Sequence, residues 1–158
     1  MPEKNLELIT WSSTLACGIK LIDDQHKELV DMVNDIVTHV VGNEEQEKRY
    51  LSEILQKVTM YIKEHFATEE KIMMTTKFSG YAVHKNAHEK FTQTVAENIK
   101  NFASGKRLSP VFFSRFLKDW ILSHIAVMDK QYFEYLRKIA TTKADGKLSI
   151  TSEDVKSL

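Results

Sequence analysis

The sequence predicts an all-α fold: an up-down-up-down antiparallel four-helix bundle with an N-terminal arm and a short C-terminal extension. Only five glycines and two prolines occur in 158 residues, and long segments lack both. Four such segments repeat apolar residues at alternating three- and four-residue steps, which is the spacing that lines one face of an α-helix. The breaks between the segments are short, and short connections favour antiparallel neighbours in a bundle.

The first two helices are expected over residues 19–41 and 44–75. The apolar stripe of the first is Ile22, Leu29, Val33, Ile36 and Val40. Gly42 and Asn43 then provide a C-terminal stop, because both residue types tolerate the left-handed conformation that ends many helices. The stripe of the second is Leu51, Ile54, Val58, Tyr61 and Ile72, and the next turn is expected over residues 77–80.

The third and fourth helices are expected over residues 81–103 and 109–140. The stripe of the third is Tyr81, Phe91, Val95 and Phe102, and the pair at 104–105 ends it. The fourth opens on Ser109, a favourable N-cap, followed by Pro110 at the first helical position, where a missing N–H costs nothing. Its stripe is Phe113, Leu117, Trp120, Tyr132 and Tyr135.

Two segments flank the bundle. The first eighteen residues, including Trp11, are expected to form an extended arm that packs along the helices, so that residues 1–140 make one domain. Residues 141–158 form a polar tail, in which Asp145-Gly146 is expected to turn and residues 152–155 could form a short helix.

Composition narrows the class of protein. Lysine plus arginine and aspartate plus glutamate both number 22, so the net charge is zero and a basic surface for nucleic acid is not expected. The single cysteine, Cys17, excludes an internal disulfide and fits a reducing compartment. Neither a signal-peptide-like start nor an apolar run of about 18 residues is present. We therefore expect a cytoplasmic protein that does not associate with membranes.

Polar residues interrupt every apolar stripe. The positions concerned are His26, His65, Glu69, His84, His88 and His124. His65 and Glu69 are four residues apart, as are His84 and His88, so each pair shares one helix face. His39 lies one residue off its stripe and is expected at the edge of the core or at the surface. Glu70 and Lys71 are expected on a solvated face, whereas Tyr81 is expected in the core.

Burying this many imidazoles with an ionised glutamate would cost several kcal/mol for the unpaired charge alone. Neutral imidazoles and carboxylates are the ligands that a borderline divalent metal ion takes, so a metal centre removes that cost. With Asp129 as a second carboxylate, five histidines and two carboxylates exceed the needs of one four-coordinate zinc. Two ions that share bridging carboxylates fit the number better, and iron, unlike zinc, has redox chemistry to perform there.

The position of Asp129 conflicts with a regular helix. It follows His124 by five residues, so the two side chains would lie about 140° apart around an α-helix. Met128, at the favourable fourth position, cannot bridge iron. We therefore predict a local widening, a π-turn, between His124 and Asp129.

Four segments of the sequence resemble the hemerythrin family. They are Trp11 with Gly18-Ile19 and Asp23-Asp24-Gln25-His26, the run from Tyr61 to Glu70, the pair His84 and His88, and the run from Trp120 to Asp129. The resemblance covers about residues 11–136, and it is the basis for including Asp129 among the candidate ligands. It implies two non-heme iron ions per chain with a bridging oxo or hydroxo group. The implied ligands are His84, His88 and His124 for one iron, His26 and His65 for the other, and Glu69 and Asp129 as bridges.

The resemblance also implies reversible oxygen binding, as an oxygen carrier or store, rather than enzymatic activity. Oxygen would bind at the open position of the iron with two histidines, inside a pocket that must stay dry. The side chains expected to wall this pocket are Leu29, Phe66, Trp120, Ile121 and Ile125, although each of them also suits an ordinary core position.

Two other functions stay open at this stage. The domain could sense oxygen or iron and signal to a protein partner that the sequence does not identify. It could also be a di-iron redox enzyme, but enzymes built on such bundles typically carry paired Glu-x-x-His motifs. No glutamate stands three residues before any of the six histidines, which disfavours the enzyme.

Overall fold

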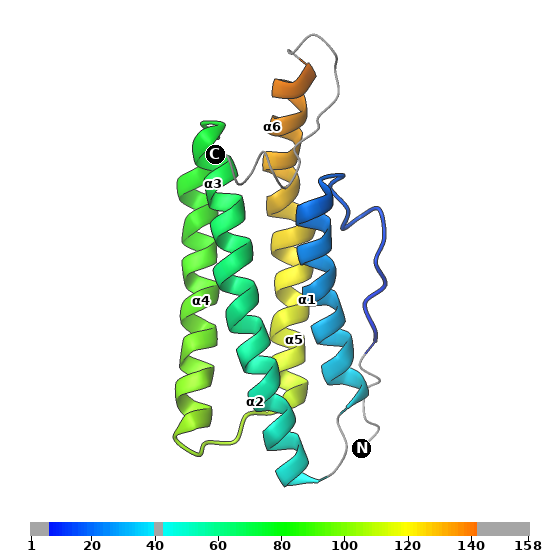
Figure 1. Ribbon diagram of the computed structural model, residues 1–158, viewed down its shortest axis with the longest axis vertical. Coiled ribbons are helices and arrows are strands. Elements are labelled where there is room, and N and C mark those ends of the chain that lie inside the picture. The colour runs from blue at the N-terminus through cyan, green and yellow to red at the C-terminus, as the bar shows by residue number, and fades with distance from the viewer. Residues whose placement is uncertain (1–6, 40–42, 142–158) are drawn as a thin grey trace.

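The computed structural model describes residues 7–39 and 43–141, with side chains as far as Lys138. Four helical rods lie side by side, and each runs antiparallel to the next in the chain (Figure 1). The all-α four-helix bundle predicted from the sequence is confirmed. The tail expected beyond Thr141, with its turn and short helix, lies outside the described residues.

Two of the four rods are single α-helices and two are interrupted by π-helix. The first rod is α1, Lys20–Thr38, and the third is α4, Tyr81–Ala103. The second consists of α2, Glu44–Tyr61, the π-helix η1, Ile62–Phe66, and α3, Ala67–Thr75. The fourth consists of α5, Pro110–Trp120, the π-helix η2, Ile121–Asp129, and α6, Lys130–Thr141. The first helix ends at Thr38, three residues before the predicted end.

Polar side chains fix where the helices begin. Asn43, predicted as part of a stop, instead caps α2, because its Oδ1 accepts hydrogen bonds from the backbone N–H groups of residues 45 and 46. Ser109 caps α5 in the same way, as predicted. Asp23 lies in the first turn of α1, and its carboxylate accepts hydrogen bonds from two backbone N–H groups that precede the helix. The donors are Cys17, at 2.8 Å, and Gly18, at 3.0 Å. Gly18 has φ 90°, which explains a glycine at this entry to the helix.

The described part of the arm packs along α1, as predicted (Figure 1). The Ile9 N–H donates to Oδ1 of Asn34 at 2.7 Å, and the Asn34 side-chain amide donates to the Ile9 carbonyl at 2.9 Å. Trp11 is half-buried against the core, with the Lys27 ammonium 5.2 Å from its ring centre. These contacts hold the arm against the first helix.

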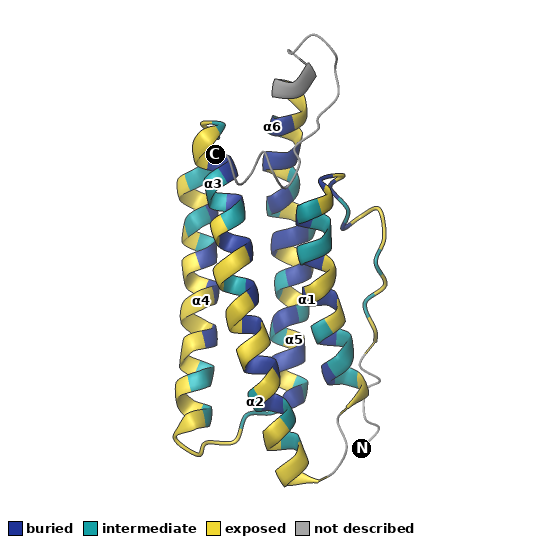
Figure 2. Ribbon diagram, in the orientation of Figure 1, coloured by how far each residue is buried: buried dark blue, intermediate teal, exposed yellow. Residues whose placement is uncertain are grey.

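Buried positions recur along every rod (Figure 2), and the buried apolar residues form two hydrophobic clusters. The larger cluster includes Leu29, Ile36, Ile54, Phe91 and Leu117, and the smaller includes Ile22, Ile72 and Tyr132. On every rod at least one of the polar residues singled out in the sequence falls between the positions of these two clusters, namely His26, Glu69, His84 with His88, and Asp129, whereas His65 and His124 lie at the end of the larger cluster. The bundle therefore holds a polar layer enclosed by apolar core on both sides. In the described part of the chain, no helix is both long and apolar enough to cross a membrane.

Candidate metal centre

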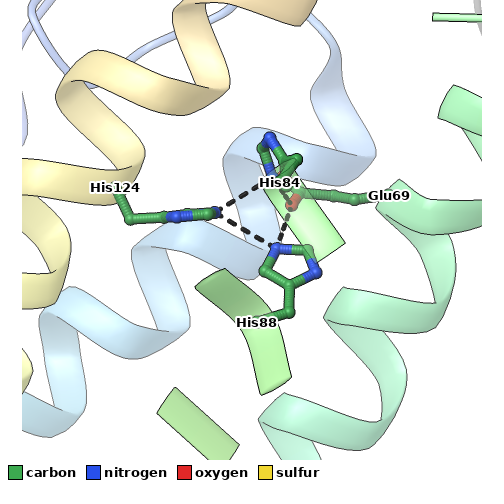
Figure 3. Close-up of side chains that lie close together, drawn as sticks. All are labelled: Glu69, His84, His88 and His124. Atoms are coloured by element: carbon green, nitrogen blue, oxygen red, sulfur yellow. Dashed lines mark hydrogen bonds and ion pairs between the residues drawn. The ribbon is translucent and has the colours of Figure 1, made fainter. Parts of the chain in front are cut away.

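Seven polar side chains from all four rods meet in the enclosed layer, and each is at most 2 % exposed. They form two groups that share Glu69. One group contains Glu69, His84, His88 and His124 (Figure 3), and the other contains His26, His65, Glu69 and Asp129. In each group the potential ligand atoms lie within 4.8 Å of one another, so each group could hold a metal ion.

The imidazole nitrogens converge at distances that suit a shared ion. Nε2 of His124 lies 3.0 Å from Nε2 of His84 and 3.1 Å from Nε2 of His88. In the other group, Nε2 of His26 lies 3.0 Å from Nε2 of His65. Two nitrogens bonded to one ion at about 2.1 Å are about 3.0 Å apart at a right angle and about 3.4 Å apart at a tetrahedral angle. The observed separations of 3.0–3.1 Å lie near these values, so the nitrogens of each group can share one ion.

Both carboxylates divide their oxygens between the two groups. Oε1 of Glu69 lies 3.2 Å from Nε2 of His65, while Oε2 lies 3.2 Å from Nε2 of His88. Oδ2 of Asp129 lies 3.1 Å from Nε2 of His26, while Oδ1 lies 3.0 Å from Nε2 of His124. This arrangement is the one that carboxylates bridging two metal ions require.

Several of these buried atoms have no hydrogen bond. Oε2 of Glu69 and both oxygens of Asp129 lie close to imidazole nitrogens but form no well-aligned hydrogen bond. Buried polar atoms left in this state cost about 1–3 kcal/mol each, and more when charged. Imidazole lone pairs and carboxylate oxygens that face one another are a donor set for cations, so the residues present fit a pair of metal ions.

The charge of the metal-free centre supports the same conclusion. Burial opposes ionisation of Glu69, but the neighbouring histidines, His65 first among them, hold its pKa well below the usual range. Burial likewise opposes protonation of His26 and His84, but Asp129 and Glu69 outweigh it and raise the pKa of each to about 9. Burial lowers the pKa of His65. The carboxylates thus attract positive charge into the layer.

The π-helix η2 positions two of the candidate ligand residues. His124 and Asp129 lie five residues apart within η2, and i→i+5 bonding brings both side chains inward. The widening predicted from this spacing is confirmed. A second π-helix, η1, was not predicted from the sequence. It brings Tyr61 and Phe66, also five residues apart, to the buried face on either side of His65.

Two histidines are oriented by side chains behind them. Nδ1 of His65 lies 2.7 Å from the amide oxygen of Gln25, and Nδ1 of His88 lies 3.1 Å from a carboxylate oxygen of Glu70. An acceptor at Nδ1 keeps the proton there and turns the Nε2 lone pair toward the metal position. Glu70 is therefore not simply on a solvated face, as the sequence suggested, because its side chain is only 21 % exposed and contacts a histidine of the centre.

Tyr132 is a residue of the centre that the sequence reading missed. Its hydroxyl donates a hydrogen bond to Oε1 of Glu69 at 2.9 Å, and the residue is fully buried. Burial, with the charges of Glu69 and Asp129, raises the pKa of Tyr132 well above its usual range, so the hydroxyl keeps its proton. Because Tyr132 lies on an apolar stripe, the sequence alone does not distinguish it from an ordinary core residue.

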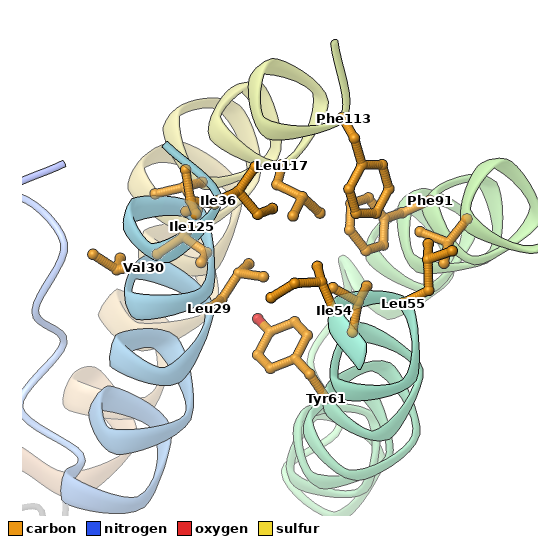
Figure 4. Packing of buried hydrophobic residues seen from close by; sticks show 14 of the residues in the cluster. Leu29, Val30, Ile36, Ile54, Leu55, Tyr61, Phe91, Phe113, Leu117 and Ile125 are labelled. Carbon is orange, nitrogen blue, oxygen red and sulfur yellow. The ribbon is translucent and has the colours of Figure 1, made fainter. Parts of the chain in front are cut away.

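The predicted pocket residues lie in the larger hydrophobic cluster beside the centre. Leu29, Ile121 and Ile125 are at most 1 % exposed. The Phe66 ring stacks on His88 with 3.8 Å between ring centres, and Trp120 stacks on His124 at 3.9 Å. Figure 4 shows Leu29 and Ile125 in this core together with Tyr61.

Residues 17–136 match the family model described as the hemerythrin HHE cation binding domain. The chain belongs to the hemerythrin family. It is 31% identical over 132 residues to the bacteriohemerythrin of Stenotrophomonas maltophilia, covering 84% of each chain. It is 28% identical to the myohemerythrin of Sipunculus nudus, covering 77% of this chain and 88% of that protein.

Solved structures agree with this membership. The crystal structure of wild-type hemerythrin superimposes with a TM-score of 0.68 at 31% identity, covering 81% of this chain and 97% of the other. A leucine-to-alanine variant of hemerythrin gives the same TM-score. The hemerythrin resemblance stated from the sequence is confirmed.

The predicted site residues can be compared with their positions in the structure. All seven side chains predicted as ligands lie in the buried centre, and His39 lies exposed, as predicted. Of the five predicted pocket residues four are buried, and Trp120 is half-buried. Tyr81 is half-buried against the smaller cluster.

Proposed function

We propose that the chain binds oxygen reversibly, as a carrier or store, at a centre of two non-heme iron ions. One ion would be held by His84, His88 and His124, the other by His26 and His65, with Glu69 and Asp129 bridging them beside an oxo or hydroxo group. The observation that carries the proposal is the division of each carboxylate between the two histidine groups. Membership of the hemerythrin family supports it.

The two groups offer unequal numbers of ligand atoms. The three-histidine group with two carboxylate oxygens offers five, and the two-histidine group with two carboxylate oxygens offers four. If each ion took six ligands and a solvent-derived group supplied one to each, the three-histidine side would be complete and the two-histidine side would keep one position free. Oxygen would bind at that free position.

The protein's own part in the reaction is to position and protect. Two ferrous ions would supply the electrons that oxygen takes on binding and returns on release. Leu29, Ile121 and Ile125 exclude water from the neighbouring core, which limits loss of bound ligand through protonation. The Tyr132 hydroxyl, through its hydrogen bond to Oε1, would hold Glu69 in the orientation needed to bridge two ions. Membership of the hemerythrin family supports binding rather than catalysis.

We assign the centre to a domain of about residues 1–140 in a cytoplasmic protein. The family model lies inside these bounds, and the arm contacts α1. The Cys17 thiol is buried, and burial raises its pKa, so that it stays in the unreactive protonated form.

The test is iron analysis with an optical spectrum of the anaerobically reduced protein, before and after exposure to air. We expect two irons per chain and a visible charge-transfer band that appears with oxygen and disappears when oxygen is removed. His26→Ala should abolish the band, whereas His39→Ala, at the exposed histidine, should leave it unchanged. One zinc per chain, or immediate conversion to a stable ferric form, would contradict oxygen carriage.

A further inference from the structure

Two buried hydrogen-bond donors beside the centre have no acceptor. The Tyr61 hydroxyl and the Trp120 indole Nε1 are both inaccessible to solvent and make no hydrogen bond among the described residues. Tyr61 is only 3 % exposed. Its oxygen points from α2 into the interior of the bundle, toward Leu29 (Figure 4). Because unpaired donors are costly to bury, tyrosine here is a poor choice for a purely apolar core, in which phenylalanine would fill the same space.

The two donors flank the metal positions from opposite groups. The Tyr61 ring stacks on His65 of the two-histidine group, with 4.9 Å between ring centres and 18° between planes. The Trp120 ring stacks on His124 of the three-histidine group, at 3.9 Å and 10°. Both belong to the hydrophobic cluster that contains the predicted pocket residues. The unpaired donors therefore lie on the pocket side of the centre, away from Tyr132 and the smaller cluster.

The Trp120 indole cannot accept a hydrogen bond from the Tyr61 hydroxyl. An indole N–H is only a donor, so it offers nothing to the phenol's hydrogen. The hydroxyl hydrogen of Tyr61 remains available for an acceptor that enters the pocket.

We propose that Tyr61 donates a hydrogen bond to a small anionic or electron-rich ligand bound at the two-histidine metal position, with the Trp120 N–H as a second donor. The inference rests on the proposed function, since it needs iron in the centre. Donors fixed in a buried, largely apolar region favour ligands that carry negative charge. Tyr61 would thus be a specificity-determining residue, selecting azide-like anions, and oxygen as it gains electron density, over neutral ligands with weak acceptors.

Azide is the probe for this donor, used with the oxidised, iron-loaded protein. Tyr61→Phe keeps the ring that stacks on His65 and removes only the hydroxyl, so optical titration should show azide affinity reduced about tenfold to a hundredfold. The matched control is Tyr50→Phe, which removes a half-buried hydroxyl bonded to Asp35 at 2.7 Å, away from the centre. Azide affinity of this control should equal that of the unmodified protein.

An infrared measurement separates a hydrogen bond from a change in packing. The antisymmetric stretch of bound azide should shift when the unmodified protein is moved into D2O, and Tyr61→Phe should lose most of that shift. Trp120→Phe, which retains an aromatic ring on His124, should lose a smaller part.

The outcomes distinguish failure of this inference from failure of the proposed function. Failure of the unmodified protein to take up two irons would overturn the proposed function. Two irons, with equal azide affinity and equal stretching frequencies in the Tyr61→Phe variant, would overturn the inference alone. Should that variant not fold, an azide stretch insensitive to D2O in the unmodified protein would overturn it as well.

Discussion

Nδ1 of His88 lies 3.1 Å from a carboxylate oxygen of Glu70. The corresponding atom of His65 faces the neutral amide of Gln25 at 2.7 Å. One imidazole of the three-histidine group is therefore supported by a negative charge, and one of the two-histidine group by a dipole. A carboxylate partner makes an imidazole a stronger base, so the three-histidine ion is expected to be the more tightly held of the two.

Glu70→Gln tests this difference, because it retains an acceptor for His88 and removes the charge. We expect the affinity for the more tightly held ion to fall by about tenfold, with the second ion little changed. Titration against a chelator of known affinity measures both. Glu64→Gln, on an exposed side chain of η1, is the control. Equal loss in both variants would show that net charge, rather than the bond to His88, is responsible.

Tyr132 gives a prediction about folding stability. Tyr132→Phe leaves the buried ring in place but removes the donor to Oε1 of Glu69, a buried carboxylate oxygen. The free energy of unfolding should fall by about 1–3 kcal/mol, because an ionised acceptor loses its partner. Denaturant titration of the metal-free protein measures it. Tyr50→Phe should cost less, since its partner Asp35 is partly exposed and regains water. Similar losses in the two variants would contradict a special role for Tyr132.

Metal removal should destabilise the bundle as a whole. The centre draws ligands from all four rods, so an ion bound only in the folded state stabilises that state by mass action. At a free metal concentration of about 100 times the Kd this amounts to about 2.7 kcal/mol, or roughly 5–10 °C in Tm for a chain of this size. Calorimetry with and without a chelator measures the difference. His39→Ala should retain it and His84→Ala should lose most of it; a chelator without effect on the unmodified protein would argue against a bound metal.

The sequence predicted the bundle because its stripes are long, regular and interrupted by clear stops. It also predicted η2, since His124 and Asp129 stand five residues apart and no α-helix turns both inward. It gave no sign of η1, because His65 and Glu69 are four residues apart and already share a face of an α-helix. Local spacing therefore reveals a helix distortion only where the functional residues conflict with the regular period.

The side chains that contact the histidines and Glu69 from behind could not be predicted from the sequence, for a different reason. Gln25, Glu70 and Tyr132 reach the centre across the bundle, over 40, 18 and 63 residues of separation along the chain. Which side chain stands behind a histidine depends on how the helices are rotated against one another. Tyr61 was counted as core for the same reason, since a stripe shows that a ring is buried but not that its hydroxyl lacks a partner.

The dryness of the pocket can be tested by a nearly isosteric polar substitution. Leu29 is fully buried, three residues after His26 on α1 and so one turn from the two-histidine group. Leu29→Asn should admit water beside the bound ligand and shorten the lifetime of the oxygen-bound protein several-fold, followed as decay of its visible band. Leu51→Asn is the matched control: Leu51 is 1 % exposed, but fourteen residues, or about 21 Å of helix, before His65. Both variants bury an amide and should lose about 1–3 kcal/mol of stability. Equal shortening of the lifetime in both would attribute it to general loosening of the core, whereas shortening confined to Leu29→Asn would show that water exclusion at this position preserves the oxygen-bound state.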